Sequence, residues 1–356
     1  MKRLLLEYQV FLSHIDEIYG FLTKVDKNVT IEKISNAIVD LDAEKEELLS
    51  FIQQLGGSTL VYNAIIISLY GCLENYIDKL LGVYLEILTE NKNTYEDLPE
   101  KLRDKYRNKL GEFLSSPQRF ANMELDLAQE ISKYNELIHS NVSGTINKNL
   151  ALAHSGNLHF NEICLLMTHL GIKDAKTKII DCSIFKEHHI NHGMDEMEYD
   201  AKRARRIDDF FIPIEQLITQ RNSVAHSWNV EDRVSLHEIK TIVLPFVKML
   251  CESILRVCMI EAFSLNADQS MFNNETPINI FHNQIVCINN QNIKIAPKDY
   301  LIYTSEDAVK IACIKNIQFN SKDISMVYET EAKDIGLELD NRIQISDKIK
   351  LIVHSM

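Results

Sequence analysis

Apolar residues recur every three or four positions through most of the first 264 residues of the chain. This spacing is typical of amphipathic helices that turn one face toward a shared core. Between Leu60 and Leu73 the chain is apolar almost all round, which favours a helix at the centre of a bundle. Residues 173–210 are less regular, and the residues that flank 187–192 within them are interpreted as loop. The pattern predicts helices over residues 2–25, 30–55, 58–88, 100–114, 122–139, 157–170 and 235–262.

The pattern changes after residue 278, where short runs rich in β-branched residues replace the helical spacing. Turn residues separate these runs, as they separate strands in small all-β domains. The sequence therefore predicts a mainly α protein: a helical domain over 1–264, a polar linker over 265–278, and a small β-barrel or sandwich over 279–356. The predicted strands lie at 278–281, 284–288, 293–295, 300–303, 309–314, 324–328 and 348–353.

Composition indicates in which compartment of the cell this protein lies. The seven cysteines form no close Cys-x-x-Cys pair and lie mostly in apolar runs, which indicates free thiols in a reducing compartment. Charge follows Met1 too soon for a secretory signal. Residues 48–73 carry no formal charge, but polar residues interrupt them, so we expect a buried helix and no membrane span. The cytoplasm is the expected location.

One stretch, residues 215–228, places a permanent cation and an imidazole at a chemically meaningful spacing. Pro213 suits the first turn of a helix, where its missing N–H costs nothing. On that helix His226 follows Arg221 by five residues, about 140° further round and one and a half turns along. Two side chains so placed can meet one phosphate. Gln220 and Asn222 fall beside Arg221 on the same helix.

This spacing resembles the motif of HEPN domains, all-helical modules of prokaryotic toxins and defence proteins, many of which cleave RNA without metal. The chain is most similar to their RiboL-PSP-HEPN-like branch. Residues 58–88, with the core Leu69-Tyr-Gly-Cys-Leu-Glu74-Asn75, look like the family's long N-terminal helix, and residues 157–172 look like its central helix. The resemblance covers roughly two thirds of the chain and not its last eighty or so residues.

The resemblance implies RNA cleavage by attack of the 2′-hydroxyl, leaving a 2′,3′-cyclic phosphate and a 5′-hydroxyl. Imidazole titrates near neutrality, so His226 is the expected acid or base. The guanidinium of Arg221 would stabilise the phosphate, because it stays charged and presents a planar fork to two oxygens. Asn222 would bind phosphate or orient the imidazole. Glu74 either steers or pairs with Arg221, or it marks where its own helix meets water.

A formal net charge of −13 argues against broad binding of nucleic acid, so RNA must meet a local basic surface. The basic residues over 101–109 are interpreted as a solvated helix face. A second cluster enters the motif helix and is the better candidate for substrate binding, together with Gln220. It comprises Lys202, Arg203, Arg205 and Arg206.

No metal or cofactor is expected. His188 and His192 stand at a spacing that can chelate zinc on a helix. No distant cysteine or carboxylate pair completes such a site, and the flanking residues are interpreted as loop. We interpret both as ordinary surface histidines.

HEPN relatives commonly dimerise so that two motifs face each other, which implies a homodimer through the motif face here. Trp228 is a candidate for that interface, and Ser227-Trp228 stands where many relatives carry glycine. An antitoxin or defence-system partner would inhibit such an enzyme. The alternative function is a non-catalytic module that binds nucleotides or protein. That alternative tolerates a buried His226, or an Arg221 occupied by an internal carboxylate.

Overall fold

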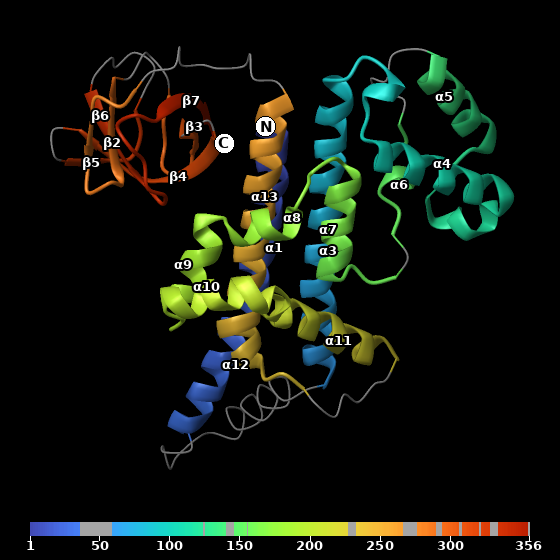
Figure 1. Ribbon diagram of the computed structural model, residues 1–356. Helices are drawn as coiled ribbons and strands as arrows, with labels where there is room; N and C mark the ends of the chain where they lie inside the picture. Colours follow the sequence, from blue (N-terminus) through green and yellow to red (C-terminus); the bar gives the residue numbers. More distant parts are fainter. Residues whose placement is uncertain are drawn as a thin grey trace.

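The computed structural model describes residues 1–35, 59–123, 125–139, 146–154, 156–226, 233–265, 276–289, 294–305, 308–319, 322–327 and 334–354. Most of the helix predicted over 30–55 lies outside these residues, as do Trp228 and most of the polar segment 265–278. A helical part and a β-domain lie side by side, with the β-domain at the upper left of Figure 1.

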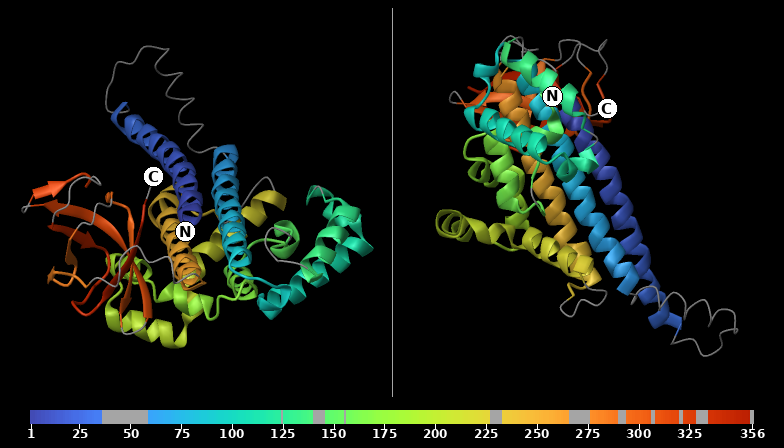
Figure 2. Two further views of the ribbon diagram at one scale, coloured as in Figure 1. Left: turned by 90° about the horizontal axis from the view of Figure 1, so that it is seen from above. Right: turned by 90° about the vertical axis from the view of Figure 1, so that its right-hand side faces the viewer.

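Three long helices run along one another at the centre of the helical part (Figure 2): α1 (Lys2–Ser35), α3 (Thr59–Glu90) and α13 (Leu244–Leu265). The helix predicted over 58–88 is confirmed as α3. It is long and apolar enough to cross a membrane, but 56% of its most apolar window is buried inside this fold. Leu69, Leu73 and Ile77 are fully buried on it. Helix α3 is therefore the core helix of the bundle.

The lobe opposite the β-domain contains α4 (Glu100–Ser115), η2 (Pro117–Met123), α5 (Leu127–His139), α6 (Lys148–Ala151) and α7 (Phe160–His169). The helix predicted over 122–139 starts later, at Leu127. The carboxylate of Asp126 accepts a hydrogen bond from the backbone N–H of Gln129 there, as residues before a helix commonly do. The helix predicted from residue 157 begins only at Phe160.

Residues 173–210 are not irregular, and the loop expected on either side of 187–192 is wrong. They form α8 (Ala175–Ile180), α9 (Ser183–Asn191), α10 (Glu196–Arg205) and η3 (Ile207–Phe211). Each element is short and is anchored by one or two large buried residues, such as Phe185, Tyr199 and Phe210. A single anchor in a helix gives no repeating apolar pattern, which is why the sequence hid these helices.

The motif lies on α11 (Ile212–His226), and the chain then forms α12 (Leu236–Glu238), the wide turn η4 (Ile239–Val243) and α13. Ser235 and Glu238 form a capping box at the start of α12. The five-residue π-type turn η4 lies just before Pro245. Proline has no N–H to continue the hydrogen-bond ladder, and a wider turn accommodates the loss.

The β-domain is a seven-stranded antiparallel sheet with the order β1-β2-β6-β4-β3-β7, and β5 pairs with β4. Among the described strands the path has two ends, so the sheet is not a closed barrel. Six or so strands were expected from the seven predicted runs. Of these runs, 293–295 appears only as the isolated bridge of Ile295 to Val327, and among the described residues of 324–328 only Ile324 lies in a strand, β5. The strands are β1 (Asn279–Phe281), β2 (Ile285–Asn289), β3 (Tyr300–Ser305), β4 (Ala308–Phe319), β5 (Lys322–Ile324), β6 (Asp334–Leu339) and β7 (Lys348–Val353).

Strand β6 escaped the sequence analysis although it lies between β2 and β4. It has only one β-branched residue in six positions, and among the described strands it is the one that contains a glycine, Gly336. The glycine has a structural reason, because a Cβ there would lie 3.3 Å from the side chain of Ile285. The buried residues Ile335, Leu337 and Leu339 do alternate along β6.

The β-domain packs on the helical part. Five of its residues belong to the main hydrophobic core, namely Tyr300, Ile302, Ile311, Leu351 and Val353. Beside them Arg256 of α13 is 1% exposed and binds two carboxylates, those of Glu252 on its own helix and Asp340 after β6. A buried ion pair thus joins the two parts.

Candidate functional site

Helix α11 presents one apolar face to the bundle. Pro213 lies in its first turn, and Ile214, Leu217 and Ile218 are buried. Helix α11 packs mainly on α3, with smaller contacts to η4 and α13. As a result, the first half of α3 lies beside the motif.

Arg221 is held by neutral groups. Its Nη1 donates hydrogen bonds to Asn157 Oδ1 at 2.7 Å and to Asn222 Oδ1 at 3.3 Å. Asn157 Nδ2 donates in turn to Asn222 Oδ1 at 2.6 Å. The guanidinium carbon lies 5.0 Å from the centre of the Tyr70 ring. Among the described residues no carboxylate pairs with Arg221, so its positive charge remains available to a ligand.

Tyr70 connects this group to the loop before α7. Its hydroxyl donates to Glu74 Oε1 at 3.0 Å and accepts from the backbone N–H of Leu158 at 2.8 Å. Burial raises the pKa of Tyr70 to about 12, so the hydroxyl keeps its proton. Glu74 therefore contacts Tyr70 and makes no ion pair with Arg221 within the described part of the chain.

His226 is the last residue of α11 and is exposed. Asn222 was expected to bind phosphate or to orient this imidazole. In the structure the Asn222 oxygen faces Asn157 and Arg221 instead. Arg221 and His226 thus share one helix, with the arginine oriented and the histidine open to solvent.

The structure separates the other expected binding residues from Arg221. Gln220 is buried, and its Oε1 accepts a hydrogen bond from the Tyr62 hydroxyl at 2.6 Å. Arg203 donates two hydrogen bonds of 2.7 Å to Asp181 and lines a cavity toward the β-domain. Arg205 and Arg206 are exposed and line a hollow with Asp209. Of the site residues expected from the sequence, Asn222 is the one that hydrogen-bonds to Arg221 within the described part of the chain.

His154, Asn157 and His159 lie against the motif helix and α3 and were not predicted from the sequence as site residues. Besides Asn157, His159 Nδ1 lies 2.6 Å from Glu215 Oε2 of α11. His154 Nε2 lies 3.6 Å from Asp78 Oδ1 of α3, and this carboxylate raises the pKa of His154. The sequence signal that could have identified these site residues is the presence of two histidines and an asparagine between two apolar helices.

Within the part of the chain that the structure describes, no group of three or more His, Cys, Asp or Glu side chains could hold a metal ion. The rings of His188 and His192 lie 4.2 Å apart on α9, with no third ligand. Burial lowers the pKa of His188 to about 4. The segment is helical, unlike the loop that was expected, and His188 packs near Phe246.

The bundle and the Arg-Asn-x-x-x-His motif define a helical domain of the HEPN class. The model of the RiboL-PSP-HEPN family matches residues 39–259. The chain therefore belongs to this family, whose match includes the motif, α3 and α7 and ends before the β-domain. No curated protein and no solved structure matches the chain significantly. HEPN domains generally dimerise and bind RNA, and many are ribonucleases.

Proposed function

We propose that the protein is a metal-independent endoribonuclease of the HEPN type. The observation that carries this proposal is the state of Arg221. Its guanidinium is oriented by the amides of Asn157 and Asn222, and no carboxylate among the described residues neutralises it. An oriented, uncompensated cation one and a half turns from an exposed histidine suits the charge that develops on a phosphate during cleavage.

In this mechanism the ribose 2′-oxygen attacks the adjacent phosphorus and the bond to the 5′-oxygen breaks. An imidazole removes the proton of the 2′-hydroxyl, and a second proton transfer protonates the leaving 5′-oxygen. Both proton transfers are assigned to His226. Arg221 binds the non-bridging oxygens, whose negative charge grows in the transition state. The products are a 2′,3′-cyclic phosphate and a 5′-hydroxyl.

One histidine and one arginine are few for three tasks, so the proposed active enzyme is a homodimer with two motifs in one cleft. Exposed apolar side chains support a partner at this face. Leu60 is 61% and Ile67 51% exposed, and both lie on the stretch of α3 that packs against α11. Ile212, at the start of α11, is 48% exposed. Apolar groups of this size favour burial against a second surface.

The proposed setting is a toxin or antiviral effector in the cytoplasm, restrained by a partner protein and using Arg205 and Arg206 to approach RNA. Seven free thiols agree with a reducing compartment. The competing proposal is a non-catalytic module that binds nucleotides or protein. It is favoured by a buried His226 or an Arg221 paired with a carboxylate, and neither occurs among the described residues.

The test compares wild type, Arg221→Ala and His226→Ala with the matched control His139→Ala, since His139 is also an exposed last residue of a helix. Each protein is induced in a bacterial host and then incubated with total RNA in EDTA. We expect cleavage leaving cyclic phosphates, reduced at least about 100-fold in the two motif variants only. The proposal would be contradicted if the wild-type protein were harmless and cut no RNA even with its neighbouring genes present.

A further inference from the structure

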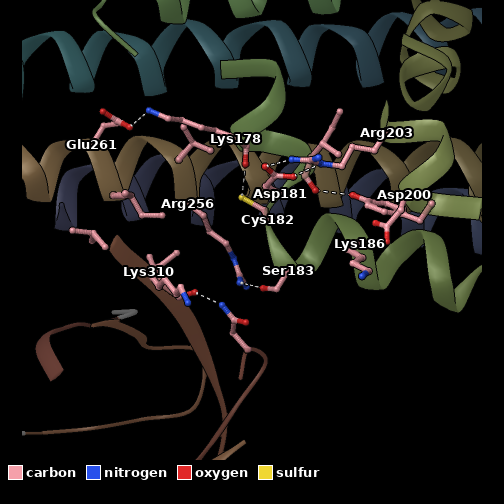
Figure 3. Close-up of a pocket in the computed structure, with 17 residues that line it drawn as sticks. Lys178, Asp181, Cys182, Ser183, Lys186, Asp200, Arg203, Arg256, Glu261 and Lys310 are labelled. Carbon is pink, nitrogen blue, oxygen red and sulfur yellow. Dashed lines mark hydrogen bonds and ion pairs between the residues drawn. The ribbon is translucent and has the colours of Figure 1, made fainter. Parts of the chain in front are cut away.

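A cavity of about 670 Å³ lies where α8, α9, α10 and α13 meet strand β4 of the β-domain (Figure 3). None of the motif residues lines it. Small-molecule sites typically have volumes of about 300–1,000 Å³ and often lie between domains. Both the size and the position of this cavity therefore fit a ligand site.

One wall of the cavity is apolar. Val257 and Ile260 of α13 face it from the helical part, and Val309 and Ile311 of β4 face it from the β-domain. A ligand that fills the space therefore touches both parts of the protein and buries an apolar or aromatic surface against these side chains.

Basic side chains outnumber acidic ones in the polar lining. Five basic and three acidic side chains line the cavity, although the whole chain has a formal net charge of −13. Four of the basic residues form ion pairs: Lys178 with Glu261, Arg203 with Asp181, Arg256 with Glu252 and Asp340, and Lys186 with Glu196. Lys310, which has no such pair among the described residues, and Lys186, whose pair is exposed, are the cations that a ligand can use.

These two lysines come from different parts of the protein. Lys310 of β4 is one of the residues that line the cavity and makes no ion pair with any described residue. Lys186 of α9 lies 3.3 Å from Glu196, whose side chain is 72% exposed, so this pair is weak. Figure 3 shows Lys310 and Lys186 on either side of Arg256 and Ser183, with Asp181 and Glu261 on another edge.

The start of α9 adds donors at the same place. Ser183 is the first residue of this nine-residue helix and lines the cavity. The preceding Cys182 provides no side-chain cap, and the first turn contains no acidic residue. The N–H groups at a helix start attract anions, most strongly phosphates. The hydroxyl of Ser183 lies 3.4 Å from Arg256 Nη1 and can donate to an anion.

We propose that this cavity binds a small phosphorylated molecule of the nucleoside monophosphate class. The phosphate lies between Lys310, Lys186 and the start of α9. The nucleoside lies along the apolar wall of α13 and β4. The bound molecule bridges the β-domain and the helical part. This inference rests on the cavity alone and does not depend on the proposed ribonuclease activity.

The test is calorimetric titration of the full chain with AMP, adenosine and inorganic phosphate. We expect saturable binding of AMP, with adenosine and phosphate each at least about tenfold weaker, because each lacks one half of the recognised structure. Lys310→Gln and Lys186→Gln each weaken AMP binding about tenfold. Lys315→Gln is the matched control, since Lys315 is exposed on the same strand and does not line the cavity.

Arg221→Ala separates this site from the motif and should bind AMP as the wild type does. Thermal unfolding of every variant verifies that it is folded. Four results would overturn the proposal: no saturable AMP binding, wild-type affinity in Lys310→Gln and Lys186→Gln, loss of binding in Arg221→Ala, or phosphate binding as tightly as AMP. The last would leave a plain anion site without a nucleoside.

Discussion

The side-chain oxygen of Asn157 accepts a hydrogen bond from Arg221 Nη1 at 2.7 Å, although 64 residues separate them in the chain. The nitrogen of the same amide donates to Asn222 Oδ1. A neutral amide thus sets the orientation of the guanidinium without reducing its charge. A carboxylate in this position would orient the arginine equally well and would compete with an RNA phosphate.

Asn157→Ala should lower kcat for RNA cleavage by about tenfold to a hundredfold, because small displacements of a positioned group cost this much. KM should change little, and the free energy of unfolding should fall by about 1 kcal/mol. Asn157→Asp should be at least as slow, since the new carboxylate pairs with Arg221. The control is Asn161→Ala, which removes an exposed contact to Lys176. Wild-type kcat in Asn157→Ala would show that Arg221 needs no such support.

Asp78 should control the titration of His154. This carboxylate, 3.6 Å from His154 Nε2, raises the pKa of His154, and Asp78→Asn should lower it. The stabilisation by this pair is present below the unfolded pKa of about 6.5 and is lost as pH rises through the folded pKa. Because the side chain of Asp78 is 45% exposed, this stabilisation amounts to about 0.5 kcal/mol. Histidine resonances followed by NMR against pH measure the shift, and no change in Asp78→Asn would refute the assignment.

Acid should destabilise the protein through the histidines of α9. Burial lowers the pKa values of His188 and His189 to about 4. The unfolded chain takes up these protons below about pH 6.5, and the folded chain does not until about pH 4. Stability therefore falls as pH falls through this window.

His189→Phe removes one titrating group and keeps an aromatic ring beside Phe185 and Phe210. Between about pH 7 and pH 4.5 the variant should lose about 1–2 kcal/mol less free energy of unfolding than the wild type. Urea unfolding at both pH values measures this difference. His237→Phe, at an exposed histidine, is the control. Equal losses in wild type and His189→Phe would assign the acid sensitivity to other groups.

Removing only the cation of the buried pair between Arg256 and Asp340 should destabilise the protein more than removing both charges. Arg256→Met leaves Asp340 and Glu252 without their cation and should cost about 3–5 kcal/mol in guanidinium unfolding. Adding Asp340→Asn removes one uncompensated charge and should recover part of that loss, since an asparagine oxygen can still accept the hydrogen bond from Cys313 N–H. A double variant less stable than Arg256→Met would contradict this account.

Helices with a repeating apolar face were predictable, and helices held by single anchors were not. Helix α3 follows from an apolar run, and α4 from regular spacing, because each pattern lies within one stretch of chain. Helices α8, α9 and α10 depend on isolated residues such as Phe185 and Tyr199, whose burial is set by neighbours distant in sequence. Strand β6 was missed for a related reason, since its partners supply the hydrogen bonds that define it.

The sequence by itself determined that Arg221 and His226 lie on one helix at a spacing that suits a phosphate, because helical geometry relates near neighbours directly. Only the tertiary structure decided which groups surround them. It brought Asn157 and Tyr70 to Arg221, turned Gln220 into the core, and directed Arg203 to a cavity against the β-domain. Periodicity is a local property of the chain, whereas contacts between distant segments arise only when whole helices and sheets pack together.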